Sequence, residues 1–401
     1  MIDLDRQKRY LLACSYGPDS MALFDMLLKG KYNFSVAHVN YNLRPESKEE
    51  TKSLKAFCKA NNIDVYIKNN KRKITKNIEE KCREIRYQFF QKIYIDNKFD
   101  SLLIAHNQDD HIETYLLQQK RKNLVLFYGI SCKSSLFSMN IIRPLLKFKK
   151  SELLEYCKNN NVPYAIDSTN LENTFLRNQI RHQIVEVMTD VERHNIIDEI
   201  NKKNMSLKTI LHEVDTFDSK YISDLIKVKE NVFPYLINAL ARKIIEYVEV
   251  SSRLCNEIKK ACLSDKPNVV VKIKNHFCFI KEYDEFKFDF DYPIYYEFNV
   301  NLGDIVNNEY LYFDTNIDLE KRNICESDFP LIISNLHKND ETKIKGYIVK
   351  VRRLFIDWKM PASIRKRWPI IRNNKNEIVY VPRYQKHFNK SSSKGFYVKI
   401  L

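Results

Sequence analysis

The chain has 401 residues and a net charge of +16, and it is long enough for two or three domains that each bury a core. Its nine cysteines include no Cys-x-x-Cys pair, which excludes a zinc ribbon and is typical of reduced thiols rather than a disulfide framework. The N-terminus is charged and no apolar run has the length of a membrane span, so we expect a cytoplasmic protein without membrane contact.

Strand-like and helix-like segments alternate through the first half of the chain. This alternation predicts an α/β fold with a doubly wound parallel sheet, in which ligands bind beyond the carboxyl ends of the strands. The expected strands are Tyr10–Cys14, Phe34–Asn40, Ile63–Lys68, Ser101–Ala105 and Asn140–Arg143.

The first expected strand leads into a turn with the sequence SYGPDS, residues 15–20. A turn of this kind directs backbone N–H groups and the positive end of a helix dipole at one point, which favours an anion. Gly17 lets the backbone approach a phosphate closely, and Asp19 is placed to hold Mg²⁺ on it. From these residues alone, a simple N-capped helix that binds nothing remains the alternative.

The turn resembles the SGGxDS pyrophosphate loop of the N-type ATP pyrophosphatases, enzymes that cut ATP between its α and β phosphates. Tyr16 stands where that pattern has its first glycine, and a tyrosine there either crowds the phosphates or imposes another backbone angle. The resemblance implies that ATP is bound by Ser15, Tyr16, Gly17, Pro18, Asp19 and Ser20.

After the fourth expected strand comes the sequence AHNQDDHIET, residues 105–114, which has more polar residues than helix capping needs. On a helix that begins near Asp109, Asp110 and Glu113 share a face, and two carboxylates on one face suit a divalent metal or a substrate ammonium group. The metal alternative predicts a phosphohydrolase acting on nucleic acid through His106, Asp109, Asp110 and His111.

Seven motifs occur in the order and spacing of the tRNA(Ile)-lysidine synthase family. They are the loop, HVNYNLRPES, ExxxRxxRY, AHNQDDHIET, RPLL, DSTN and RNQIR, spread over about 170 residues. This family joins L-lysine to C2 of the wobble cytidine of a tRNA(Ile) with a CAU anticodon. The cytidine first attacks the α-phosphate of ATP and pyrophosphate leaves, after which the lysine ε-amine attacks C2 and AMP leaves.

The resemblance also implies a role for individual residues. Asp19 would hold Mg²⁺, His106 would lie beside the reacting phosphate, and Asp110 and Glu113 would receive the lysine. Two further departures are Tyr41, in place of the second histidine of HVNH, and residues 122–125, in place of a Gly-rich turn. The residues that would contact tRNA are Arg83, Arg86, Arg177, Arg181, Arg365, Lys366 and Arg367.

Beyond residue 187 the alternation stops. Asn204–His212 predicts a connecting helix, Asn231–Leu263 is helical, and Val269–Lys274 with Cys278–Phe290 has the pattern of a hairpin. The family implies a catalytic domain over residues 1–200, a mainly helical tRNA-binding domain over 201–295, and a mixed α/β domain over 296–401. A homodimer is left open, and so is a non-catalytic RNA-binding relative.

The positive charge is concentrated at the end of the chain. Residues 350–401 contain fourteen Lys and Arg against two acidic residues, a balance of +12 that is typical of a local nucleic-acid surface. Ile378–Pro382 predicts a strand within this stretch. Three aromatic residues among the basic ones either stack on RNA bases or form a core: Trp358, Trp368 and Tyr384.

Overall fold

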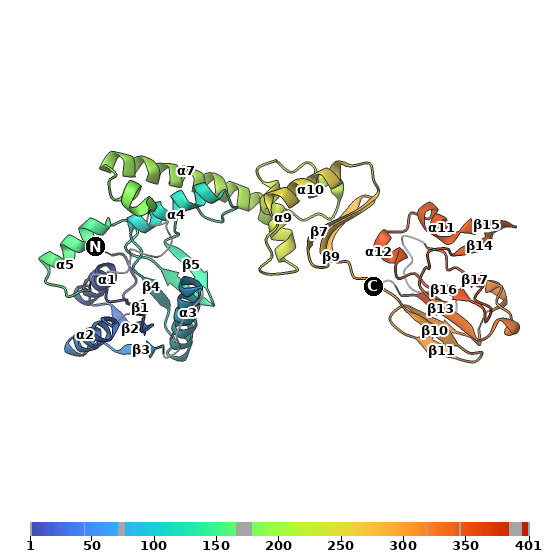
Figure 1. Cartoon of the computed structure of the whole chain (residues 1–401), viewed down its shortest axis with the longest axis horizontal. Coiled ribbons are helices and arrows are strands. Elements are labelled where there is room, and N and C mark those ends of the chain that lie inside the picture. Colours follow the sequence, from blue (N-terminus) through green and yellow to red (C-terminus); the bar gives the residue numbers. More distant parts are fainter. Residues whose placement is uncertain are drawn as a thin grey trace. The chain divides into compact units, whose positions relative to one another are not determined.

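The computed structural model describes residues 2–43, 45–70, 77–165, 179–317, 319–344, 346–384 and 395–399. The chain divides into two compact units, Met1–Thr209 and Ile210–Leu401, called here the N-terminal and the C-terminal unit (Figure 1). The DSTN motif and Arg177 lie outside the described residues.

The N-terminal unit is built on a six-stranded sheet with the order β3-β2-β1-β4-β6-β5. All neighbours in this sheet run parallel except β5, which forms an antiparallel hairpin with β6. This confirms the predicted doubly wound α/β fold, to which β5 is an addition. The strands are β1 (Arg9–Ala13), β2 (Asn33–Asn40), β3 (Val65–Asn69), β4 (Ser101–Ile104), β5 (Lys133–Leu136) and β6 (Met139–Ile142).

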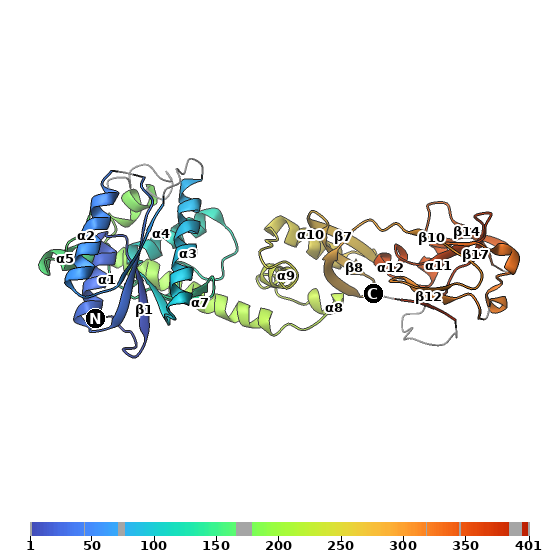
Figure 2. The same ribbon diagram turned by 90° about the horizontal axis from the view of Figure 1, so that it is seen from below.

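Helices cover both faces of this sheet (Figure 2). Along β1, Tyr10 and Leu12 pack in the core on one face and Leu11 packs in the core on the other, because successive side chains of a strand alternate. The first face is covered by α1 (Pro18–Lys29), α2 (Ser47–Ala60) and α5 (Lys150–Asn159), and the second by α3 (Ile78–Asp96).

The described part of this unit also contains α4 (Gln108–Arg121), a π-helical turn η2 (Arg181–Val185) and most of α7 (Asp190–Asp215), which continues into the C-terminal unit. Ile112 of α4 packs on Val185 of η2 in a small separate core. The connecting helix expected at Asn204–His212 is part of α7, which is much longer than predicted. Its buried apolar residues Ile200, Leu207 and Val214 are seven positions apart, a stripe too narrow to reveal the full helix.

The C-terminal unit begins with helices α8 (Ile222–Leu225), α9 (Phe233–Arg242) and α10 (Ser252–Leu263), packed on the antiparallel sheet β7 (Asn268–Lys274), β8 (Phe277–Glu282) and β9 (Glu285–Phe290). The helical stretch Asn231–Leu263 is thus two helices, and Asn238 holds the break through bonds with Val250 N and O, at 2.8 and 3.0 Å. The expected hairpin has a third strand because the chain turns at Tyr283, which has a positive φ of 56°.

The rest of this unit is mixed α/β, as predicted. Its strands form a four-stranded sheet β10-β13-β16-β17, a three-stranded sheet β11-β12-β18 and the hairpin β14-β15. The elements are β10 (Glu297–Val300), β11 (Ile305–Asn307), β12 (Leu311–Asp314), η3 (Glu320–Arg322), η4 (Glu326–Asp328), β13 (Leu331–Ser334), β14 (Glu341–Ile344), β15 (Tyr347–Lys350), α11 (Val351–Asp357), α12 (Ala362–Arg365), β16 (Ile370–Arg372), β17 (Ile378–Tyr380) and β18 (Phe396–Val398).

Two of the three aromatic residues in the basic stretch are part of its core. Trp368 and Tyr384 are buried, their rings contact each other edge to face, and the Trp368 indole donates a 2.7 Å hydrogen bond to Pro382 O. Trp358 is half-buried against the same core. The core alternative therefore holds for Trp368 and Tyr384.

All nine cysteines are free, and the exposed ones are Cys132 and Cys325. Three are buried in the N-terminal unit and three in the C-terminal unit. Among the described residues, no helix combines the length and the apolar character that crossing a membrane requires.

Candidate active site

The SYGPDS loop connects β1 to α1 at the carboxyl edge of the parallel strands. The hydroxyl groups of Ser15 and Ser20 lie 3.3 Å apart, so both point to the same place. Ser20 Oγ donates to Gly17 O at 2.9 Å, and Gly17 N–H donates to Ser15 Oγ at 3.3 Å. The hydroxyl and amide donors that a phosphate needs are thus gathered in one turn.

The unusual backbone angle of the loop lies at Tyr16 and not at Gly17. Tyr16 has a φ of 69°, in the left-handed region, whereas Gly17 is extended with φ −78° and ψ 166°. The Tyr16 ring is buried in the core, so it does not crowd the loop, and its carbonyl accepts a bond from Ala165 N at 2.9 Å. A Cβ on Gly17 would lie 3.3 Å from Ser15 Oγ, so a larger residue there would push on this hydroxyl group.

Asp19, at the start of α1, has a buried oxygen without a donor. Its Oδ1 makes no hydrogen bond within the described part of the chain. Burial, with the charge of Asp110 adding to it, raises the pKa of Asp19 to about 6, although Lys150, Asn107 and Arg181 oppose the shift. A cation would satisfy such an oxygen, and Mg²⁺ is usually held by one or two carboxylates together with substrate phosphates. The residues present therefore fit Mg²⁺.

His106 follows β4 and is held by an arginine to which the sequence pattern assigned no role. Arg143 Nε donates to His106 Nδ1 at 3.1 Å, and Arg143 Nη1 donates to Ser131 O and Ser134 Oγ at 2.8 and 3.0 Å. Because a guanidinium group can only donate, Nδ1 carries the lone pair and the proton of a neutral His106 is on Nε2. The available signal was an arginine at the end of a strand, within the RPLL motif.

The two carboxylates predicted to share a face of α4 do so, and both bind Arg181. Glu113 is fully buried and accepts two bonds from the Arg181 guanidinium, of which Nη2 to Oε2 is 3.0 Å. Asp110 Oδ1 lies 3.4 Å from the same Nη2, while Asp110 Oδ2 completes a capping box with Asn107. The two carboxylates thus hold one cationic side chain between them.

One cavity connects Asp110 and Arg181 to the SYGPDS loop. Its lining includes Ser15, Gly17 and Asp19 from the loop, together with Asp110 and Arg181. The hydroxyl and amide donors of the loop and the carboxylate of Asp110 therefore face the same space.

A second cavity also reaches the loop and has an aromatic and aliphatic wall. It extends from Ser15 and His106 to a wall formed by Val39, Tyr41, Tyr87, Phe90 and Ile104. Such a wall suits a flat organic group whose charged end reaches the loop.

Tyr87 of this wall belongs to α3 and Tyr41 to the loop after β2. Arg86 and Arg83 are exposed and lie over the Tyr87 ring, at 5.6 and 4.8 Å from its centroid. Tyr41, which replaces the family's histidine, donates to Cys82 O at 3.0 Å and joins its loop to α3. Burial raises the pKa of Tyr41 to about 12, so it acts as a neutral donor.

The residues of the metal alternative do not converge. Asp109 Oδ1 pairs with the buried Arg193 at 2.7 Å, and His111 Nδ1 accepts a bond from Ile130 N at 2.8 Å. Within the described ranges there is no group of three or more His, Cys, Asp or Glu placed to hold a metal ion. The metal-dependent phosphohydrolase is therefore not favoured.

The three basic residues predicted to contact tRNA in the C-terminal unit differ in availability. Arg365 is half-buried and donates to Met360 O at 2.7 Å and to the Tyr283 hydroxyl at 2.9 Å. Lys366 is ion-paired with Asp291. Arg367 is exposed, and its side chain makes no hydrogen bond or ion pair with the described residues.

Comparison with known proteins defines the class and then the family. Residues 1–188 match a family model described as a PP-loop domain, the ATP-using class that the fold and the SYGPDS loop indicate. The chain is 30% identical over 407 residues to the tRNA(Ile)-lysidine synthase of Mycoplasma mycoides subsp. mycoides SC, covering 97% of this chain and 100% of the relative.

Two other relatives carry the same name. The tRNA(Ile)-lysidine synthase of Mesoplasma florum is 34% identical over 291 residues, covering 69% of this chain and 72% of the relative. That of Mesomycoplasma hyopneumoniae is 40% identical over 185 residues, covering 45% of this chain and 61% of the relative. The chain belongs to the tRNA(Ile)-lysidine synthase family.

Proposed function

We propose that this protein ligates L-lysine to C2 of the wobble cytidine of a tRNA(Ile) with a CAU anticodon, using ATP to adenylate the cytidine and releasing AMP and pyrophosphate. The observation that carries the proposal is the cavity lined by the SYGPDS loop, by Asp110, and by the Arg181 side chain that Asp110 and Glu113 hold. The two steps need this proximity, because the α-phosphate of ATP and the ε-amine of lysine react in turn with the same cytidine.

In the first step, residues 15–20 bind the pyrophosphate end of ATP. The adenosine end has the aromatic wall of the second cavity, with Tyr41 and Tyr87, within reach of the same loop. Asp19 would hold Mg²⁺, which when bound neutralises charge that develops on the phosphates. His106, held by Arg143, presents its Nε2–H as a donor to the reacting phosphate.

In the second step, Asp110 and Glu113 receive the lysine. The pairing of Arg181 with both carboxylates supports this role, because it shows a cationic side chain accommodated there at hydrogen-bond distance. The lysine ammonium must lose a proton before it attacks, and a carboxylate within hydrogen-bond reach is a suitable acceptor. The two carboxylates and the loop come from one chain, so the proposal needs no second copy.

We further propose that Arg83, Arg86, Arg177 and Arg181 act on tRNA or nucleotide phosphates in a catalytic domain of residues 1–200. Residues 201–295 and 296–401 would then bind the body of the tRNA in the cytoplasm. Of the three basic residues 365–367, Arg367 has the side chain most available for a phosphate.

The test uses labelled lysine, ATP and an unmodified tRNA(Ile) transcript with a CAU anticodon. Asp110→Asn should weaken lysine incorporation at least tenfold while adenylation of the tRNA, followed from labelled ATP, persists. Asp190→Asn is a matched control, because this carboxylate lies in the same unit and is exposed. An equal loss of both steps in Asp110→Asn would contradict the lysine role and indicate nucleotide or metal binding instead.

A further inference from the structure

Aromatic rings form an exposed stack at the end of β9. The rings of Phe290 and Tyr292 are 5.6 Å apart and nearly parallel, at 6°, and the His276 ring lies 4.8 Å from Tyr292, tilted by 38°. Phe290 is 37% exposed and Tyr292 is 52% exposed. Aromatic faces kept in water cost free energy unless a partner covers them, so this stack indicates a binding surface.

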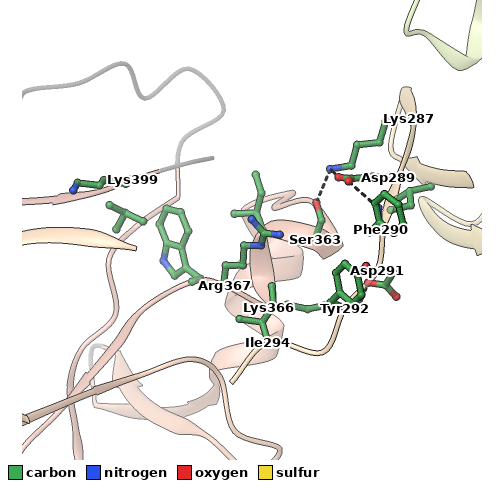
Figure 3. A pocket seen from close by; sticks show the side chains of 14 residues that line it. Lys287, Asp289, Phe290, Asp291, Tyr292, Ile294, Ser363, Lys366, Arg367 and Lys399 are labelled. Carbon is green, nitrogen blue, oxygen red and sulfur yellow. Dashed lines mark hydrogen bonds and ion pairs between the residues drawn. The ribbon is translucent and has the colours of Figure 1, made fainter. Parts of the chain in front are cut away.

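Basic side chains surround the stack in one pocket of the C-terminal unit. Figure 3 shows Phe290 and Tyr292 on one wall and Lys366 and Arg367 on the segment that faces them. Lys366 is neutralised by Asp291 beside Tyr292, whereas Arg367 has no such partner among the described residues. The pocket therefore offers ring faces and one available guanidinium group.

We propose that this pocket binds an unpaired nucleotide of RNA, with its base on the Tyr292–Phe290 stack and its phosphate at Arg367. Single-stranded RNA is bound in this way, by stacking on aromatic side chains with a cation at the backbone, whereas the bases of a duplex are already stacked and cannot enter. The proposal rests on the proposed function only in that tRNA is the RNA which supplies the nucleotide.

Two aromatic residues of the basic stretch itself are less suited to stacking on a base. Trp368 and Tyr384 are buried and their rings pack on each other, so a base cannot reach their faces. The basic residues of the pocket therefore come from the stretch 350–401, whereas the rings available for stacking come from β9 and the residues after it.

The experiment is a titration of the full-length protein with a six-nucleotide single-stranded RNA that carries 2-aminopurine, whose fluorescence reports stacking. Tyr292→Ala should weaken binding by about 5- to 100-fold, the range measured for loss of one stacking ring. Tyr292→Phe should retain binding, because the ring face remains. Tyr247→Ala is the matched control, because Tyr247 is 86% exposed in the same unit but does not line this pocket.

Three outcomes would overturn the proposal: equal binding by Tyr292→Ala and the unaltered protein, loss of binding in Tyr247→Ala to the same extent, or competition by an RNA duplex as effective as by the single strand. If Tyr292→Ala lowers the melting temperature, Tyr292→Leu keeps the apolar contact with Phe290 without a ring and should still bind weakly.

The assay separates this proposal from the ligase proposal, because it needs neither lysine nor ATP. Absence of lysine incorporation together with Tyr292-dependent RNA binding would refute the ligase and leave the pocket. Lysine incorporation together with RNA binding indifferent to Tyr292 would refute the pocket alone.

Discussion

Three arginines beside the site of the N-terminal unit are held more tightly than two arginines of the basic stretch in the C-terminal unit. In the N-terminal unit, Arg143, Arg181 and Arg193 each bind a specific partner and are buried or half-buried. In the basic stretch, Arg372 is buried in the same way, 2.7 Å from Asp340, but Arg353 and Arg367 are exposed to solvent. The number of positive charges therefore indicates a nucleic-acid partner. Burial then separates the charges that stabilise the fold from those that a ligand can reach.

The energetic consequences differ accordingly. Removing one partner of a buried ion pair leaves a charge without solvent or counterion, whereas an exposed pair adds only a few tenths of a kcal/mol to about 1 kcal/mol. The four predictions below test this difference, from the largest expected effect to the smallest.

The largest effect is expected for the buried pair between Arg193 and Asp109, which are 2.7 Å apart. Arg193→Met should lower the free energy of unfolding by about 3–5 kcal/mol, because Asp109 is left buried and unpaired. Arg353→Met, which breaks the exposed pair with Asp357, should cost less than about 1 kcal/mol. Urea unfolding followed by circular dichroism measures both, and equal costs would remove the distinction between the two regions.

Asp19→Asn should lower turnover by about 10²- to 10³-fold, because the amide keeps the shape of the side chain but loses the charge that would hold Mg²⁺. AMP, pyrophosphate and lysine incorporation should fall together in an assay at saturating tRNA. Release of ADP and orthophosphate by the unaltered protein would instead refute the cleavage of ATP between its α and β phosphates.

Asp19 should also make stability depend on pH when Mg²⁺ is removed by a chelator. Burial raises its pKa from 3.8 to about 6, so the folded chain binds the proton more tightly than the unfolded chain. The stabilisation is present below about pH 4 and is lost as the pH rises through 6, a change of up to about 3 kcal/mol. Asp19→Asn should lack this loss, and urea unfolding at pH 4.5 and pH 7.5 measures it. The same pH dependence in both proteins would contradict the assignment.

The smallest effect is expected in the basic stretch, where Arg365, Lys366 and Arg367 should differ in what they contribute to tRNA binding. Arg367→Ala should reduce the log–log salt slope of tRNA binding by about 0.7–0.9 and raise KM, because one phosphate contact is lost. Arg365→Ala should change stability more than the slope, since its guanidinium bonds Met360 and Tyr283. Nitrocellulose filter binding between 50 and 300 mM salt measures the slope. An equal change of slope in both variants would mean that Arg365 leaves its partners to bind RNA.

Local patterns in the sequence predicted much of the fold and of the site. Alternation located the parallel strands, and the spacing of Asp110 and Glu113 placed them on one face, because both signals depend only on neighbours along the chain. The hairpin strand β5, with the sequence KSSL, lacks such a pattern since it is short and half-exposed. The partner of Arg365 was equally hidden, because Tyr283 lies 82 residues away.

The loop illustrates the same limit at a single residue. A glycine was the natural place to expect an unusual angle, yet Tyr16 takes it, because burial of the ring in the core outweighs the cost of about 1–2 kcal/mol for a left-handed tyrosine. Whether burial of a side chain offsets the free-energy cost of such an angle depends on residues from other elements. A local sequence pattern does not contain these residues.

The distribution of the cysteines has a practical consequence. Each unit carries one exposed thiol, Cys132 or Cys325, and three buried ones, and the N-terminal unit also has the half-buried Cys82. Under native conditions a maleimide dye should therefore react first at these two positions, giving a donor and an acceptor on separate units without any engineered residue. The slower labelling of the buried thiols then reports the opening of each unit separately, so that binding of tRNA by either unit can be followed as protection of its own cysteines.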